Sequence, residues 1–219
     1  WSSSTPAIGS IGSASGIVSG ITAGNTTITY TFTTTGCYIT ADVTVNPLPA
    51  PIMGSTGFCN LTTTTLSDAT PGGTWSSLDP SIAYFPSSTS GALTGSSVGT
   101  GTICYILPTG CKVCRPETII LAPYPITGPT QVCEGSCTTL GNIITGGTWT
   151  STSPANATIT TPGGVLCGIT AGTSVVSYEL SNGCYSTQTE TVNPTPGAIT
   201  GTPEVCVGLT TTLYNGMAG

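Results

Sequence analysis

The chain repeats itself about every 73 residues, and this period limits its possible folds more than any other feature. Trp1, Trp75 and Trp149 follow one another at intervals of 74 residues, and each opens a similar phrase: WSSSTPAIG, WSSLDPSIA or WTSTSPANA. Coils of a β-solenoid repeat at only about 20 to 30 residues, so a longer repeat with several strands indicates domains in an array. Each unit has room for about seven short strands, which is enough for a small β-sandwich.

Pro-x-Pro linkers separate the repeats. They predict two complete repeats at 50–122 and 123–195, the back part of a repeat at 1–49 and the front part of another at 196–219. Together the two partial pieces have the length of one repeat. Because such pieces would expose unpaired strand edges, we expect the C-terminal piece of one segment to meet the N-terminal piece of the next. The junction would form either within one longer polypeptide or by strand complementation between copies.

Composition favours a folded chain made of strands. Charged residues make up 5% of the sequence, against roughly 25% in an ordinary globular domain. The surface must therefore be solvated mainly by the hydroxyl groups of 46 Thr and 24 Ser. Since Val, Ile, Tyr and Thr recur in alternating runs of high β-propensity, the chain does not resemble a disordered one. The expected fold class is all-β, with tandem β-sandwich repeats.

Charge and cysteine content restrict the partners and the compartment. With two cationic residues, eight carboxylates and a net charge of −6, the chain cannot neutralise a nucleic-acid backbone or an anionic membrane surface. No apolar run approaches the roughly 20 residues that a membrane span needs. Ten cysteines without a histidine indicate disulfides rather than metal sites. We therefore expect an exported protein in an oxidising compartment.

The repeated phrases resemble a known family. WSSLDPSIAYF, WSSSTPAIG and GITAGNTTITYTF are similar to bacterial immunoglobulin-like domains of group 2, which recur in adhesins and surface proteins. The VNPLP linker, the cysteine near the last turn and the VC-x-G start resemble long repetitive surface proteins of Bacteroidota-type bacteria. The resemblance covers essentially the whole chain. It implies an immunoglobulin-like sandwich and a stalk or adhesive role at the cell surface, and no catalytic residue.

Two cysteine pairs stand outside the repeat pattern. Cys104 and Cys114 flank the turn around Thr109 and Gly110 at equal offsets, which places them opposite each other on one hairpin. Cys137 and Cys167 are expected to face each other on the neighbouring strands B and E of the immunoglobulin-like fold. We predict a local disulfide for each pair.

The other six cysteines occur once per repeat, in two sets. The turn cysteines lie in the F–G turn, and the front cysteines lie just before the A–B turn. The turn cysteines are Cys37, Cys111 and Cys184, and the front cysteines are Cys59, Cys133 and Cys206. One scheme pairs the sets within a repeat, as Cys59–Cys111 and Cys133–Cys184. The other, Cys59–Cys184, ties consecutive repeats, because the two turns of one sandwich should lie about 15 Å or more apart. The sequence leaves both schemes open.

No set of residues points to catalysis, a cofactor or a metal. Cys111-x-x-Cys114 has the spacing of a zinc or redox motif, but a second ligand pair and any histidine are lacking. A Ser-His-Asp triad is excluded because the sequence has no histidine to act as the base. The carboxylates are scattered along the chain and are expected at solvated surface positions. Three tryptophans could stack on sugars, and these are Trp1, Trp75 and Trp149. A tryptophan at the same position of every repeat is more typical of a residue in the sandwich core.

These observations favour a structural role. We expect a repeat segment of an extracellular bacterial fibre or adhesin stalk, stiffened by disulfides and Pro-x-Pro linkers. Its partners would be copies of itself or adjacent repeats, joined head to tail. The alternative is a carbohydrate- or cell-binding module, in which loops of one repeat recognise a surface glycan. Neither hypothesis involves an enzyme.

Overall fold

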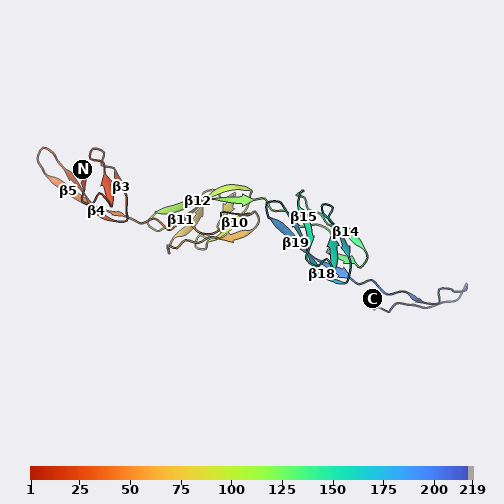
Figure 1. Cartoon of the computed structure of the whole chain (residues 1–219). Helices are drawn as coiled ribbons and strands as arrows, with labels where there is room; N and C mark the ends of the chain where they lie inside the picture. Colours follow the sequence, from red (N-terminus) through yellow and green to blue (C-terminus); the bar gives the residue numbers. More distant parts are fainter. Residues whose placement is uncertain (217–219) are drawn as a thin grey trace. The chain divides into compact units, whose positions relative to one another are not determined.

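The computed structural model describes residues 1–216, and these residues form strands, turns and loops without any helix (Figure 1). The expected all-β fold class is confirmed. The chain divides into two compact units, Trp1–Ile120 and Leu121–Gly219. Within the described residues there is accordingly no helical segment that could cross a membrane.

The first unit contains a complete sandwich of seven strands. Its larger sheet has the order β6 (Gly57–Cys59), β12 (Lys112–Ile120), β11 (Gly99–Ile106) and β8 (Thr74–Ser77). Its smaller sheet has the order β7 (Thr63–Thr65), β10 (Ala92–Gly95) and β9 (Ala83–Tyr84). β6 pairs with β12 in parallel, and the other pairs are antiparallel. Two sheets of four and three strands give an immunoglobulin-like sandwich.

The second unit repeats this topology strand for strand. The larger sheet consists of β13 (Gln131–Cys133), β19 (Tyr185–Asn193), β18 (Gly172–Glu179) and β15 (Thr148–Ser151). The smaller sheet consists of β14 (Cys137–Thr139), β17 (Val165–Gly168) and β16 (Ala157–Ile159). Again the first strand, β13, pairs in parallel with the last, β19.

The two ends of the chain carry the complementary parts of this topology. Residues 1–49 contain the equivalents of the last five strands, in two sheets. These sheets are β1 (Ser2–Ser3) with β4 (Gly24–Thr31) and β5 (Tyr38–Val45), and β2 (Gly9–Ile11) with β3 (Val18–Gly20). Residues 196–216 contain the pair β20 (Thr200–Gly201) and β21 (Leu213–Tyr214). The bridge Thr127↔Gly141 occupies the same repeat position as Thr200↔Tyr214. The boundaries 1–49, 50–122, 123–195 and 196–219 stay a prediction, and residues 217–219 lie outside the described ones.

Each complete core is built around one Trp–Tyr pair. Trp149 packs on Tyr178 with ring centroids 4.6 Å apart, and the equivalent pair in the first unit is 4.8 Å apart. The Gly-Gly-Thr before Trp149 makes this possible. Gly146 turns the chain with a φ of 87°, and a Cβ on Gly147 would lie 2.5 Å from the Tyr178 ring. Both glycines are therefore needed for the turn and for the close approach of the ring.

The first tryptophan departs from the expected core position. Trp75 and Trp149 are 6% exposed, whereas Trp1 is 45% exposed although it also stacks on a tyrosine, Tyr30, at 4.7 Å. In the complete sandwich, Ile126 and Leu140 belong to the same cluster as Trp149. Both precede the tryptophan in the repeat, so residues 1–49 do not contain their equivalents. Trp1 therefore lies at an uncovered core face.

Candidate functional site

The ends of the chain expose the apolar side chains that the complete repeats bury. Leu213 is 53% exposed, whereas its equivalents Leu66 and Leu140 are each 2% exposed. Ile199, Val205, Tyr30 and Phe32 show the same contrast with their equivalents in the second sandwich, which are Ile126, Val132, Tyr178 and Leu180. These positions of residues 1–49 and 196–216 are therefore more exposed than the equivalent positions of the complete sandwiches.

The front cysteines lie beside the end of the last strand. In the parallel pairing of β6 with β12, Cys59 is opposite Ile120. In the parallel pairing of β13 with β19, Cys133 is opposite Asn193. The chain continues from each of these two partners into the linker that leads to the next repeat.

The turn cysteines lie at the opposite end of the same strand. Cys111 directly precedes β12, and Cys184 directly precedes β19. Since each of these strands has nine residues, its ends are about 25 Å apart at 3.3 Å per residue. A disulfide needs its Cα atoms within about 7 Å. The pairing of Cys59 with Cys111, and of Cys133 with Cys184, is therefore wrong.

Two hydrogen bonds bring an F–G turn to the linker that precedes its own repeat. The Cys111 thiol donates to the carbonyl of Asn46, with sulfur and oxygen 3.9 Å apart. In the second unit, Asn182 Nδ2 donates to the carbonyl of Leu121 at 2.8 Å. Asn182 Oδ1 also accepts the backbone N–H of Cys184 at 3.0 Å, which fixes the turn.

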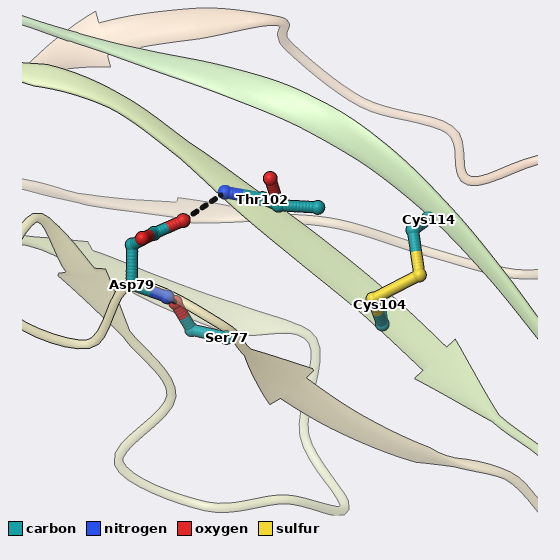
Figure 2. Close-up of a disulfide and its surroundings, with 5 residues drawn as sticks. All are labelled: Ser77, Asp79, Thr102, Cys104 and Cys114. Atoms are coloured by element: carbon teal, nitrogen blue, oxygen red, sulfur yellow. Dashed lines mark hydrogen bonds between the residues drawn. A yellow bond between two sulfur atoms is a disulfide. The ribbon is translucent and has the colours of Figure 1, made fainter.

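The two local pairs form disulfides within their own sandwiches. Cys104 lies opposite Cys114 in the register of β11 and β12, and the bridge between them has a Cα–Cα distance of 4.1 Å (Figure 2). Nearby, the Asp79 carboxylate accepts the N–H of Thr102 at 2.9 Å and so ties a loop to β11 (Figure 2). The zinc or redox alternative for Cys111 and Cys114 fails, since Cys114 is already bonded to Cys104.

The remaining cysteines fall into two groups. Cys137 and Cys167 face each other on β14 and β17 and are joined with a Cα–Cα distance of 4.1 Å. Cys59 and Cys184 are both disulfide-bonded. Four of the described cysteines are free thiols, and these are Cys37, Cys111, Cys133 and Cys206. One front cysteine and one turn cysteine are thus oxidised, and two of each set are free.

Two carboxylates contradict the expected surface position. Glu117 and Glu190 occupy equivalent places in the last strands of the two sandwiches, and both are 0% exposed. Arg115 Nη2 bonds to Glu117 Oε2 at 2.9 Å. Glu190 Oε1 accepts a hydrogen bond from Gln188 Nε2 at 2.8 Å. Each carboxylate has one buried oxygen without a hydrogen-bond partner, Glu117 Oε1 and Glu190 Oε2.

Burial raises the pKa of both side chains. For Glu117 the loss of hydration raises the pKa, and the nearby Arg115 offsets this in part through its charge and its hydrogen bond. For Glu190 the same loss of hydration raises the pKa, and the hydrogen bond from Gln188 opposes it. In both cases the net direction is upward. The sequence contained a signal for this, since Glu190 stands two residues before the core residue Val192 and so on the same strand face.

Glu190→Gln is expected to stabilise the second sandwich at neutral pH. A carboxyl whose pKa is raised by folding contributes stability below its unfolded pKa, near 4.5, and loses it as the pH rises through the folded value. The amide removes the buried charge, so the free energy of unfolding should rise by about 1 to 3 kcal/mol at pH 7. The gain should shrink towards zero at pH 3.5. Urea unfolding at both pH values measures this.

The exposed Glu179 in the same sandwich provides the control. Glu179→Gln should leave the free energy of unfolding unchanged at both pH values. An equal gain for Glu190→Gln at pH 3.5 and pH 7 would show that ionisation of Glu190 does not carry the effect.

The described residues offer no metal centre. Within residues 1–216, no three His, Cys, Asp or Glu side chains are grouped so that they could hold a metal ion. The features that stand out are therefore the uncovered core faces at the two ends and the two sets of repeated cysteines.

Comparisons with known proteins find similar architectures in solved structures. No protein-family model matches the chain, and no curated protein matches it. The chain is similar to invasin, a bacterial integrin-binding protein, at 15% identity over 80% of this chain and 46% of that one, with a TM-score of 0.41. It is also similar to a 282-residue C-terminal fragment of intimin in complex with the intimin-binding domain of its translocated receptor. That likeness has 15% identity over 68% of this chain and 67% of the fragment, with a TM-score of 0.38.

A third similar structure comprises domains 4 and 5 of the S-layer protein SbsC. Here the identity is 17%, over 59% of this chain and 82% of that one, with a TM-score of 0.25. The chain spans 39% of a longer SbsC structure that contains domains 1–6. These scores are low, and the immunoglobulin-like assignment therefore rests on the strand order and register of the chain itself.

Proposed function

We propose that the chain is a structural segment of an extracellular bacterial fibre or adhesin stalk, in which immunoglobulin-like repeats are stacked head to tail. One observation carries the proposal: two complete sandwiches with the same strand order and register follow each other in the chain, and residues 1–49 contain the equivalents of the last five strands. Residues equivalent to 196–216 are the partner that fits residues 1–49, because they hold the missing positions of the same core.

Several properties agree with a structural role outside the cell. Charged groups are few, histidine is absent, and six of the ten cysteines are disulfide-bonded. Disulfides persist in oxidising compartments, and each typically adds about 2 to 4 kcal/mol to a domain whose core is small. A catalytic role is not part of the proposal.

Electron microscopy of the native material tests the proposal. The nine-residue strands correspond to about 30 Å per repeat. We therefore expect unbranched filaments whose axial period corresponds to one repeat or to a multiple of it. Discrete globular particles, or a period unrelated to a multiple of one repeat, would contradict the proposed fibre.

A further inference from the structure

We propose that each complete sandwich closes one edge of its larger sheet with a segment of its own chain, so that a second copy of the chain cannot pair with this edge. The edge strands are β8 in the first unit and β15 in the second. The closing segment comprises residues 85–91, between β9 and β10, or residues 160–164, between β16 and β17. We call it the edge segment. The inference concerns each sandwich by itself and does not rest on the proposed fibre.

The strands β8 and β15 lack the usual protection of an edge strand. A free edge presents unpaired N–H and C=O groups, and proteins commonly guard it with charged residues, with proline or with a bulge. The two strands have the sequences TWSS and TWTS, without a charge or a proline. Threonine and tryptophan also favour strands. Since only 5% of the whole sequence is charged, another group must guard the edge.

In the second sandwich a single hydroxyl group guards the edge. Thr161 Oγ1 accepts the backbone N–H of Trp149 at 3.0 Å and donates to the carbonyl of Trp149 at 2.9 Å. In an antiparallel pair such as β15 with β18, alternate residues direct both backbone groups away from the partner strand. Trp149 is such a residue, and a further strand would bond to the same two groups. The Thr161 hydroxyl thus occupies the place of a further strand.

A second hydroxyl guards the edge of the smaller sheet in the same sandwich. Ser151 Oγ, on β15, donates to the carbonyl of Ala157 at 2.6 Å. Ala157 begins β16, which is an edge strand of the smaller sheet. One backbone acceptor of this second edge is therefore also occupied from within the sandwich.

The first sandwich guards the edge at its tryptophan with a backbone group. The N–H of Trp75 donates to the carbonyl of Ser88 at 2.7 Å, and Ser88 lies in the edge segment, as Thr161 does in the second sandwich. The two edge segments have different sequences, FPSSTSG and TTPGG. A contact that recurs although the sequences differ indicates that the fold maintains the position of the segment rather than one particular side chain.

Both edge segments are fixed to the sandwich at their last residue. The carbonyl of Gly91 accepts the N–H of Leu66 at 2.8 Å, and the carbonyl of Gly164 accepts the N–H of Leu140 at 2.9 Å. A Cβ atom on either glycine would clash with the carbonyl oxygen of that same leucine. Because only glycine allows so close an approach of two backbones, the edge segment is a fixed cover rather than a loose loop.

Thr161→Val tests the inference, because it keeps the shape of the side chain and removes both hydrogen bonds to Trp149. We expect hydrogen exchange of the Trp149 amide, followed by NMR, to become about tenfold faster. The Trp75 amide has its own acceptor and should exchange as in the wild type. In sedimentation, the variant should self-associate at a concentration about tenfold lower than the wild type requires. Thr161→Ala removes the same hydroxyl without a second methyl group and should give the same results, also where the valine variant does not fold.

Two further variants serve as controls. Thr161→Ser retains the hydroxyl and should show the exchange and the association of the wild type. Thr158→Val places the same apolar group at an exposed position of β16 and should also behave as the wild type. Unchanged exchange and association in Thr161→Val and Thr161→Ala would overturn the inference, as would faster exchange without stronger association. Equally strong association of Thr158→Val would overturn it as well, because the added methyl group rather than the opened edge would then cause the association.

Discussion

Trp149→Ala should unfold the second sandwich at modest temperature, whereas Trp1→Ala should barely change the stability of the isolated chain. Trp149 is 6% exposed and contacts Tyr178, so its removal leaves a large cavity in a small core. Such a truncation typically costs about 3 to 5 kcal/mol, out of a total of about 5 to 15 kcal/mol for a domain. Trp1 is 45% exposed and has less packing to lose. Calorimetric unfolding of the two variants measures the contrast.

Thr150→Ala provides the matched control, because Thr150 is exposed on the same strand next to Trp149. It should leave the melting temperature within about 1 to 2 °C of that of the wild type. Equal losses for Trp1→Ala and Trp149→Ala in the isolated chain would contradict the uncovered face at the N-terminal end. In assembled filaments, by contrast, the Trp1→Ala variant should dissociate more readily than the wild type.

The architecture was predictable because the same strand and turn patterns occur three times in the sequence. The tryptophan phrase, the glycine turns and the alternating stretches define strands at the same offsets, and the confirmed all-β sandwich follows from them. The two glycines before Trp149 illustrate this, because the turn and the ring contact both require them. The local cysteine pairs were equally predictable from the sequence, since the offsets from the hairpin turn alone place Cys104 opposite Cys114.

Three features could not be obtained from the sequence pattern. Glu117 and Glu190 are buried, although charged side chains are rarely buried. The general preference of carboxylates for the surface predicted exposure, whereas their position on the core face of the strand predicted burial. The exposure of Trp1 became clear only from the packing of the complete sandwich, in which residues that precede the tryptophan in the repeat cover it. The rejection of the pairing within a repeat required the parallel register of β6 with β12 and of β13 with β19.

Leu213→Asp should strongly weaken the joining of copies while both complete sandwiches stay folded. The equivalent Leu66 and Leu140 are 2% exposed in their cores, so the proposed junction would bury residue 213 in the same way. An unpaired carboxylate in such a place costs several kcal/mol, and about 1.4 kcal/mol corresponds to a tenfold change in affinity. We therefore expect filament formation to weaken at least a hundredfold, as measured by sedimentation and by electron microscopy. Circular dichroism should report unchanged folding of the complete sandwiches.

The neighbouring Thr212→Asp separates burial from charge. Thr212 corresponds to Thr65 and Thr139, which remain exposed in the complete sandwiches, so the same added charge would stay in water. Filaments of the Thr212→Asp variant should form as those of the wild type do, at matched concentration and ionic strength. Normal filaments from Leu213→Asp would mean that residues 196–216 do not enter the core of a neighbouring copy. Loss of filaments in both variants would mean that added charge, rather than burial at position 213, controls the assembly.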